Sequence, residues 1–210
     1  YTTATWTERV REEKMTPRHE LPTPGPAAQI AACFNALIPI LETERLVLRG
    51  PRLSDFPTFV EVTGSPRAVH IGGPMDRDTA WSEFAGMVAT WLLHGHGAWT
   101  IEDAASFDVQ GLVLLGLEPG DQEVALGYIL TENAEGKGIA AEAAEAVRDW
   151  AAQELEITEL VSYIDRGNVR SVRVAERLNA ARDLSAEKQF DDKVYVYRHP
   201  APGARQCPTQ

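Results

Sequence analysis

Short apolar runs bounded by turn-forming residues recur along this chain and predict the strands of a sheet. Runs of this kind, rich in β-branched, leucine and aromatic residues, suit strands that are buried on one or both faces. The predicted strands are residues 46–48, 98–101, 111–117, 124–130, 160–164 and 193–198.

Between these runs, apolar residues repeat at the spacing i, i+3, i+4 and i+7, which predicts amphipathic helices. Asp76 or Asp78 is the predicted N-cap of the third helix and Asn168 that of the last. The apolar stripe of the third helix is Trp81, Phe84, Ala85, Val88, Trp91 and Leu92, and this regular spacing favours a core position for both tryptophans over a ligand cage. The predicted helices are residues 27–38, 54–62, 81–92, 140–155 and 168–179.

The order of these elements predicts the fold class. Strands 98–101, 111–117 and 124–130 are joined by short turns, which indicates an antiparallel meander. Strand 124–130, helix 140–155 and strand 160–164 form a βαβ unit, whose strands run parallel. We therefore predict an α/β (α+β) fold with a mixed, mostly antiparallel central sheet of about six or seven strands flanked by about four helices.

The two ends of the chain lack the pattern of the middle. We expect residues 1–39 to form a partly disordered N-terminal extension with a short helix over 27–38, because several prolines interrupt regular structure there. The predicted domain is residues 40–199, and residues 200–210 form a disordered tail. The apolar segment at 27–38 is too short to span a bilayer, and its charged lead-in contains acids, unlike that of a signal peptide.

Charge and cysteine content narrow the classes of function. The 210-residue chain has a formal net charge of −11, with 44% hydrophobic and 24% charged residues. This balance argues against nucleic acid or an anionic membrane as partner and suits a cationic amine, although acidic surfaces also serve solubility. Cys33 and Cys207 lie near opposite ends and the five histidines are scattered, so we expect a cytoplasmic protein without a bound metal.

The segment after strand 124–130 is the strongest candidate for chemistry. The run Glu135-Gly136-Lys137-Gly138-Ile139-Ala140 separates that strand from an alanine-rich helix. The first N–H groups of a helix have no partner within the helix and lie at the positive end of its dipole, so they bind anions. The glycines allow tight turns and a close approach of the anion to the backbone. We predict that this loop holds a pyrophosphate.

Four motifs in one order carry a resemblance to a known family. They are Leu-Glu-Thr-Glu-Arg-Leu-Val-Leu-Arg at 41–49, Leu-Gly-Tyr-Ile-Leu at 126–130, Gly-Lys-Gly-Ile-Ala-Ala-Glu-Ala at 136–143, and the Asn-x-x-Ser run at 168–178. On these motifs the chain from about residue 40 to 199 resembles the GNAT acetyltransferase superfamily, in its branch of ribosomal-protein N-terminal acetyltransferases.

This resemblance implies an enzyme that transfers the acetyl group of acetyl-CoA directly to a primary amine, of a small molecule or a peptide N-terminus, in a ternary complex. It implies that pantetheine lies along the end of strand 124–130, where a backbone N–H polarises the thioester carbonyl. The Asn-x-x-Ser motif would hold the cysteamine portion and reprotonate the thiolate. The implied catalytic residues are Leu130 and Ser171, and the implied cofactor-binding residues are Tyr128, Ile129, Leu130, Glu135, Gly136, Lys137, Gly138, Ile139, Ala140 and Asn168.

The chain departs from the family pattern at two of these positions. Ala125 stands where an acidic residue that can act as base is common, and Glu135 stands where the phosphate loop often begins with Arg, Gln or Trp. The general base therefore stays open among Glu132, Glu61 and His70, each of which suits the chemistry without matching a motif.

Other interpretations stay open beside the enzyme. One is a non-catalytic GNAT-fold module that binds CoA or nothing and serves assembly or regulation. A Rossmann dinucleotide site is weaker, because the third glycine of its fingerprint and a repeated βαβ pattern are missing. Asn168 and Ser171 also suit a purely structural role at a helix N-terminus. A homodimer formed through the sheet or through residues 27–38 is a further expectation.

Overall fold

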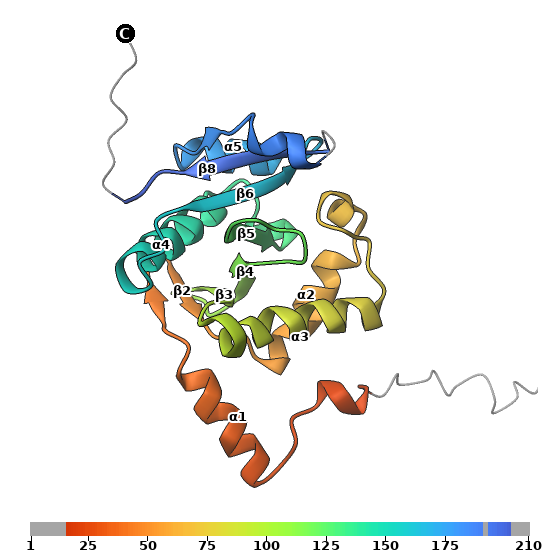
Figure 1. Ribbon diagram of the computed structural model, residues 1–210. Coiled ribbons are helices and arrows are strands. Elements are labelled where there is room, and N and C mark those ends of the chain that lie inside the picture. The colour runs from red at the N-terminus through yellow and green to blue at the C-terminus, as the bar shows by residue number, and fades with distance from the viewer. Residues whose placement is uncertain (1–15, 191–192, 203–210) are drawn as a thin grey trace, which may run out of the picture.

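The computed structural model describes residues 16–190 and 193–202. The disorder predicted for residues 1–15 and 203–210 therefore lies outside the described residues. Helix α1 occupies the segment where the sequence predicts a short helix before Pro39 (Figure 1).

A single sheet of eight strands, in the order β1-β2-β3-β4-β5-β6-β8-β7, forms the centre of the molecule. All neighbouring strands are antiparallel except β5 and β6, so the predicted mixed, mostly antiparallel sheet is confirmed. The predicted number of six or seven strands is too low, because β1 and β7 are two-residue strands that carry no hydrophobic period. The strands are β1 (Leu41–Glu42), β2 (Leu46–Arg49), β3 (Ala98–Asp103), β4 (Val109–Gly116), β5 (Ala125–Leu130), β6 (Leu160–Asp165), β7 (Ala181–Arg182) and β8 (Val194–His199).

Five α-helices lie within the described residues, in agreement with the four predicted to flank the sheet and the short helix predicted at 27–38. They are α1 (Pro26–Ala36), α2 (Phe56–Thr63), α3 (Arg77–His94), α4 (Ile139–Glu154) and α5 (Val169–Arg177). The described 3-10 turns are η2 (Arg18–Glu20), η3 (Leu53–Asp55), η4 (Pro66–His70), η5 (Glu132–Ala134) and η6 (Ala186–Phe190). Asp76 rather than Asp78 caps α3, since its side chain accepts a hydrogen bond from the Thr79 N–H at 2.8 Å.

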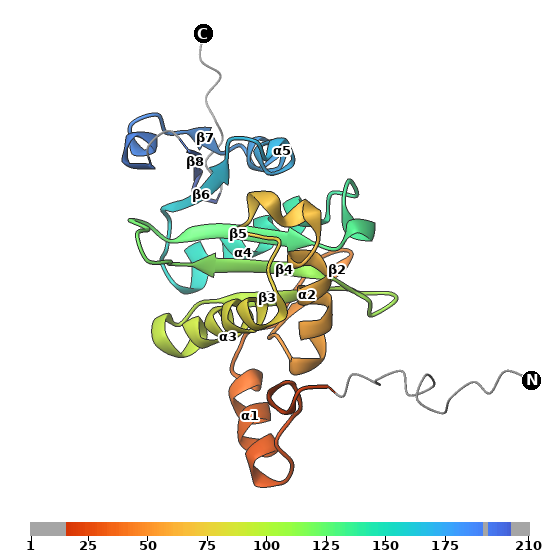
Figure 2. The ribbon, with the colours of Figure 1, turned by 90° about the vertical axis from the view of Figure 1, so that its right-hand side faces the viewer.

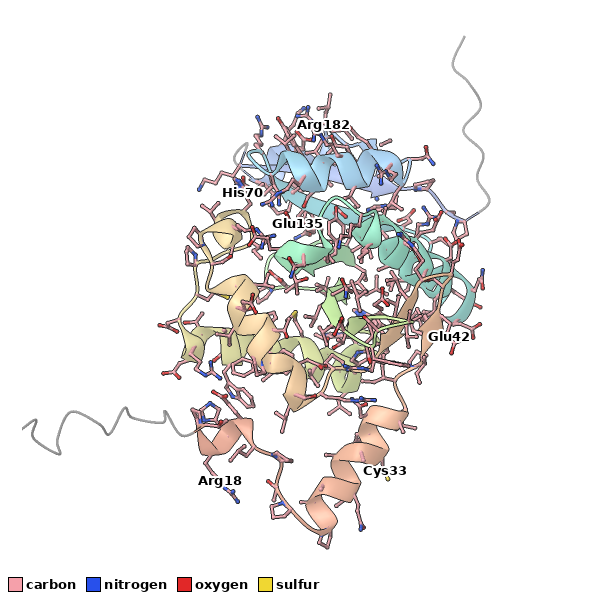
Figure 3. All side chains as sticks on the ribbon, turned by 180° about the vertical axis from the view of Figure 1, so that it is seen from behind. Arg18, Cys33, Glu42, His70, Glu135 and Arg182 are labelled. Carbon is pink, nitrogen blue, oxygen red and sulfur yellow. The ribbon has the colours of Figure 1, made fainter. Side chains whose placement is uncertain are left out.

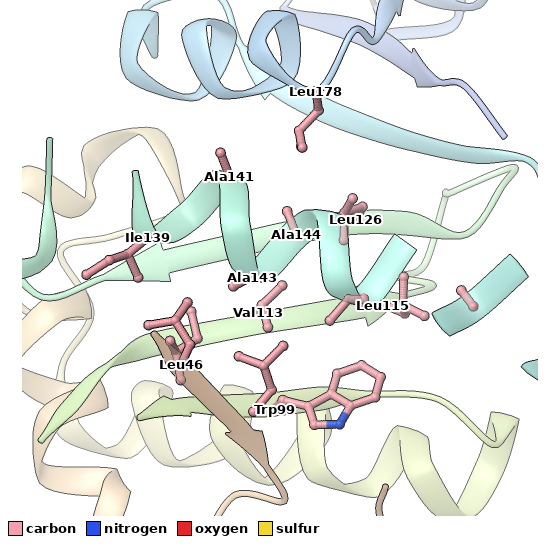
Figure 4. Packing of buried hydrophobic residues seen from close by; sticks show 14 of the residues in the cluster. Leu46, Trp99, Val113, Leu115, Leu126, Ile139, Ala141, Ala143, Ala144 and Leu178 are labelled. Atoms are coloured by element: carbon pink, nitrogen blue, oxygen red, sulfur yellow. The ribbon is translucent and has the colours of Figure 1, made fainter. Parts of the chain in front are cut away.

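The sheet separates two hydrophobic clusters. Helix α4 covers one face, and α2 and α3 cover the other (Figures 1 and 2). The cluster under α4 joins the helix's alanines and Val147 to strand residues such as Leu46, Trp99 and Leu126 (Figure 4). The second cluster, built around Phe56 and Phe84, packs α2 and α3 against the opposite face.

The apolar stripe predicted for α3 is partly wrong. Phe84 is buried and the tryptophans pack against the clusters as expected, but Ala85 is exposed and Leu92 is 72% exposed. Trp91 donates its indole N–H to the Ala98 carbonyl at 2.9 Å, which fixes that side of the helix against β3. Leu92 follows about 100° further around the helix and therefore points away from the sheet.

A buried ion pair fixes α2 to the sheet. The Asp55 carboxylate, just before α2, accepts two hydrogen bonds from the Arg49 guanidinium, at 2.8 and 3.0 Å, and one from the Thr100 hydroxyl at 2.7 Å. Burial alone would raise the pKa of Asp55, but these hydrogen bonds outweigh it and hold the pKa below its usual value. Both residues of this pair are therefore charged and satisfied inside the protein.

Strands β5 and β6 touch at one end and then separate. Their only registered pair among the described residues is Ala125 with Val161. One residue further, the Ser162 hydroxyl donates to the Leu126 carbonyl at 2.6 Å, and the same oxygen accepts from the His199 Nε2–H at 2.9 Å. Beyond this bridge the two strands diverge toward their carboxyl ends and open a gap in the sheet.

Candidate active site

The main-chain groups of β5 that face the gap can be identified from the ladder with β4. The Thr131 N–H donates to the Gln110 carbonyl at 2.9 Å, so the next pair, Leu130 with Gly111, is a non-hydrogen-bonded pair. The N–H and carbonyl of Leu130, and by alternation those of Tyr128, therefore point away from β4 and into the gap. The hydrogen bond from Ser162 to the Leu126 carbonyl agrees with this alternation.

A pocket of about 560 Å³ lies at this gap and is called the arginine pocket here. The end of β5, the glycine loop, the start of α4, α5 and η4 form its walls. It brings together every predicted site residue except Lys137, which borders a smaller hollow beside Arg45. The predicted residues in its wall are Tyr128, Ile129, Leu130, Glu135, Gly136, Gly138, Ile139, Ala140, Asn168 and Ser171.

The glycine loop has the left-handed backbone that its sequence predicts. Gly136 and Gly138 have φ of +72° and +82°, and Gly138 is the N-cap of the 16-residue helix α4. A Cβ at Gly138 would lie 3.6 Å from guanidinium nitrogens of Arg177 and Arg45, which is ordinary contact distance. Glycine is therefore required here by the backbone angle rather than by lack of space.

Four arginines give the pocket its charge, and the sequence-based prediction missed them. Arg67 comes from η4, while Arg170, Arg173 and Arg177 come from α5. The three on α5 stand at i, i+3 and i+7, which places them on one face of the helix. This spacing is visible in the sequence, but the prediction considered only the apolar face of that helix.

The side chain of Glu135 lies among these arginines. It forms ion pairs with Arg67 and, at 2.5 Å, with Arg170, so its carboxylate bridges η4 and α5. These ion pairs explain how the loop can begin with the acidic residue Glu135, which departs from the family pattern. The acid at the start of the loop is neutralised by two guanidinium groups, and the loop's backbone remains free to bind an anion.

Tyr128, Asn168 and Ser171 form a small hydrogen-bonded group in the wall of the pocket. The Tyr128 hydroxyl donates to the Ser171 carbonyl at 3.0 Å, and burial raises the pKa of this tyrosine far above its ordinary value. The Asn168 side-chain oxygen accepts from the Ser171 N–H at 3.2 Å, so the predicted cap of α5 is confirmed. The Asn168 side chain and the Ser171 backbone are thus held together at the mouth of the gap.

A second pocket, of about 310 Å³, lies on the other side of β5 and is called the carboxylate pocket here. It shares Ile71, Tyr128, Ile129, Asn168 and Ser171 with the arginine pocket. No lysine or arginine of the described chain lines it. Burial, and then the charges of Asp121 and Glu83, raise the pKa of Glu118. Besides Tyr128, its titratable lining residues are His70, Glu83, Glu118, Asp121, Tyr163 and Asp165.

Of the three candidate bases, one lies at a pocket. His70 lines the carboxylate pocket, and its Nδ1 lies 2.7 Å from the Asp165 carboxylate at the end of β6. Glu61 and Glu132 are exposed and line neither pocket. Figure 3 shows His70 and Glu135 near each other beneath the layer that contains α5. Ala125, the second departure from the family pattern, also borders the carboxylate pocket.

Two further properties concern the described residues only. No group of three or more His, Cys, Asp or Glu side chains there is arranged to hold a metal ion, and the absence of a metal stays a prediction. No helix in residues 16–190 or 193–202 has both the length and the apolar composition needed to cross a membrane.

Comparison with known proteins agrees with this geometry. A family model described as "Acetyltransferase (GNAT) domain" matches residues 45–181. The chain therefore belongs to the GNAT acetyltransferase family.

Solved structures extend the match. An acetyltransferase from Agrobacterium tumefaciens strain C58 is 40% identical, with 77% of this chain and 94% of that chain covered and a TM-score of 0.73. The ribosomal L7/L12 alpha-N-protein acetyltransferase RimL, in complex with coenzyme A, is 20% identical, with 78% and 98% covered and a TM-score of 0.61. A Bordetella pertussis protein described as a GNAT-family acetyltransferase is 24% identical, with 78% and 99% covered and also a TM-score of 0.61. The last two are similar in fold.

Proposed function

We propose that this protein is an N-acetyltransferase that moves the acetyl group of acetyl-CoA directly to a primary amine in a ternary complex. One observation carries the proposal. Where β5 and β6 diverge, an arginine-lined and a carboxylate-lined pocket share Tyr128, Asn168 and Ser171. A polyanionic donor and a cationic acceptor can therefore approach one point from opposite sides.

In this proposal the donor occupies the arginine pocket. The N–H groups at the start of α4 bind the pyrophosphate, and the surrounding arginines contribute charge. The pantetheine arm lies along the main-chain groups of Tyr128 and Leu130 that face the gap. The Leu130 N–H donates to the thioester carbonyl as negative charge develops on its oxygen, at no cost in reorganisation. The Ser171 hydroxyl gives a proton to the departing thiolate.

The acceptor occupies the carboxylate pocket as a cationic amine, belonging either to a small molecule or to a peptide N-terminus. The four carboxylates of this pocket support a positively charged group, in agreement with the net charge of −11.

A homodimer and a cytoplasmic location stay predictions. The exposed apolar residues of α1, Ile30 and Phe34, support a homodimer through this helix, which sedimentation velocity tests.

The alternative is a non-catalytic module that binds CoA and supports assembly or regulation. Ala125 favours it, because no carboxylate stands at the position where the family often has one. The two functions differ in turnover, so binding and CoA release must be measured separately.

Calorimetric titration with acetyl-CoA is the first test. We expect micromolar binding to the parent protein and at least about a 100-fold loss in Gly138→Asp, which adds negative charge and a strained left-handed residue to the loop. Gly95→Asp is the matched control, because Gly95 has φ of +72° at the C-terminus of α3 and lines neither pocket.

CoA release in the presence of amine acceptors then separates the two functions. Release of free thiol that depends on the amine supports the acetyltransferase. Binding of acetyl-CoA without release of CoA in the presence of any amine of a broad panel supports the non-catalytic module. A folded parent that does not bind acetyl-CoA overturns the proposal.

A further inference from the structure

We infer that His70 is the general base that deprotonates the acceptor amine, and that Asp165 positions its imidazole for this step. The inference rests on the acetyltransferase function proposed above. It fills the role of general base, which Ala125 leaves open, and it depends on a contact between residues 95 positions apart in the chain.

The two residues form a held pair. The Asp165 Oδ1 atom lies 2.7 Å from His70 Nδ1 and also accepts from the Gly167 N–H at 2.8 Å. Because a carboxylate only accepts hydrogen bonds, Nδ1 carries a hydrogen and donates a hydrogen bond to Asp165. In the neutral imidazole the lone pair then resides on Nε2, which is the basic atom.

Gly167 makes this close approach possible. A Cβ at this position would lie 2.6 Å from His70 Cε1 and 3.1 Å from the Asp165 carboxylate. The histidine side chain therefore packs directly over the backbone that leads from β6 into the Asn168 cap of α5. This packing places the imidazole beside the Asn-x-x-Ser motif, at the end of the carboxylate pocket that adjoins the arginine pocket.

The carboxylate of Glu118 lies further from the point that the two pockets share at Tyr128, Asn168 and Ser171. Glu118 follows β4, whose last residue, Gly116, pairs with Ala125 at the start of β5. Tyr128 lies three residues further along β5, which corresponds to about 10 Å of extended strand. Glu118 thus borders the distant end of the pocket, where it suits binding of acceptor charge rather than removal of a proton from the reacting nitrogen.

The proton balance of the step is complete. The acceptor enters as an ammonium ion, and His70 Nε2 takes one proton to give the neutral amine. The nitrogen lone pair forms the C–N bond to the thioester carbon, and the C–S bond then breaks with its electron pair on sulfur. The second nitrogen proton reaches that thiolate through the Ser171 hydroxyl, which gives one proton and regains one. The imidazolium finally releases its proton to water.

The test compares two acceptors of different protonation state. Ethylamine is an ammonium ion at neutral pH and needs a base, whereas hydroxylamine is already neutral. CoA release is measured with each as probe for the parent, His70→Gln and Asp165→Asn, with His94→Gln as a control because His94 lines neither pocket. General-base catalysis contributes about 100-fold or more, so His70→Gln should lose about that factor in kcat/KM with ethylamine and less than about threefold with hydroxylamine.

Further measurements distinguish a base from a structural residue. Asp165→Asn should lower kcat with ethylamine by about tenfold while KM changes little, since it disturbs only the orientation of the base. Added imidazole should partly restore ethylamine turnover in His70→Ala. The acetyl-CoA affinity should be unchanged in all these variants, because neither His70 nor Asp165 lines the arginine pocket.

Each remaining outcome overturns the inference. Equal losses with the two acceptors, or no loss in His70→Gln, contradict His70 as base and leave the acetyltransferase proposal standing. A parent that binds acetyl-CoA but releases CoA with neither acceptor, nor with any amine of the broad panel, contradicts both proposals.

Discussion

The arginine pocket and the carboxylate pocket lie on opposite sides of one strand and share several wall residues, yet their charges are opposite. The first has four arginines and a single carboxylate, Glu135, which is paired with two of them. The second has four carboxylates and the imidazole of His70. The difference teaches that strand β5 separates two electrostatic environments and that the gap beside it connects them.

The supporting structure of the two pockets also differs. The arginine pocket is built largely from the contiguous β5, α4 and α5 region, where neighbouring segments fold against one another. Residues of α2 and η4 border both pockets, whereas α3, from the N-terminal half of the domain, borders only the carboxylate pocket. Four substitutions or conditions test this comparison, taken in order of decreasing effect.

The largest effect is expected from Asp55→Ala, which should lower the free energy of unfolding by about 4 kcal/mol. The substitution leaves the buried Arg49 guanidinium with Glu102 as its remaining carboxylate partner, and breaking a buried pair costs about 3–5 kcal/mol. Urea unfolding measures the change. Asp78→Ala, at an exposed position of α3, should change stability by less than about 0.5 kcal/mol. A loss for Asp55→Ala as small as that of the control would show that α2 is held to the sheet by packing alone.

The protein should become less stable in acid, because of the buried His199 at the point where β5 and β6 separate. Burial, and then the charge of Arg148, lower the pKa of His199 from 6.5 to about 4. Between these values the unfolded chain binds a proton that the folded protein does not, so stability is complete above about pH 6.5 and declines as the pH falls to about 4. Between about pH 6.5 and pH 4, protonation of His199 should lower the free energy of unfolding by ~3 kcal/mol in total.

Urea unfolding at a series of pH values measures this loss, with His199→Gln for comparison. Other carboxylates also contribute in acid, so the difference between the two proteins isolates the histidine. Parallel curves for parent and variant over this pH range would contradict a neutral, buried His199.

Arg177→Glu should weaken acetyl-CoA binding by about 100-fold without changing the carboxylate pocket. Arg177 borders the glycine loop, and a charge-assisted hydrogen bond to phosphate contributes about 1.5–3 kcal/mol. Calorimetry at two salt concentrations measures the acetyl-CoA affinity of both proteins. The affinity of the variant should depend less on salt than that of the parent. Arg18→Glu, at an exposed position remote from both pockets, serves as the charge-matched control (Figure 3).

Glu135→Gln should have the smallest effect, a gain of about fivefold in acetyl-CoA affinity. It removes the carboxylate that engages Arg67 and Arg170 and leaves the loop backbone unchanged. Glu132→Gln, three residues earlier and exposed, should leave the affinity unchanged. Weaker binding in Glu135→Gln would mean that this side chain positions the two arginines for the donor.

Local sequence patterns predicted most of the fold and the glycine loop. The loop, its helix and the parallel βαβ unit depend on neighbouring residues, so glycine positions and apolar periods describe them. The short edge strands β1 and β7 were missed, since two residues cannot carry a period. Leu92 was assigned to the buried stripe because periodicity does not tell which side of a helix the sheet will cover.

The parts of the candidate site that depend on neighbouring residues could be predicted from the sequence, and those that depend on distant contacts could not. The spacing of the arginines on α5 stands in the sequence, and the prediction overlooked it. By contrast, the pair of His70 with Asp165 and that of Arg67 with Glu135 join distant segments through η4. No local pattern marks either pair, because each depends on how the chain returns across the sheet.

The single registered pair between β5 and β6 has a consequence for cooperativity. With so few main-chain hydrogen bonds across this boundary, β6, β8 and α5 form a unit whose local opening is separable from that of β1 to β5. Hydrogen exchange should therefore report two protection levels in the free protein. A ligand seated between the units contacts both, so its binding energy would make them open together.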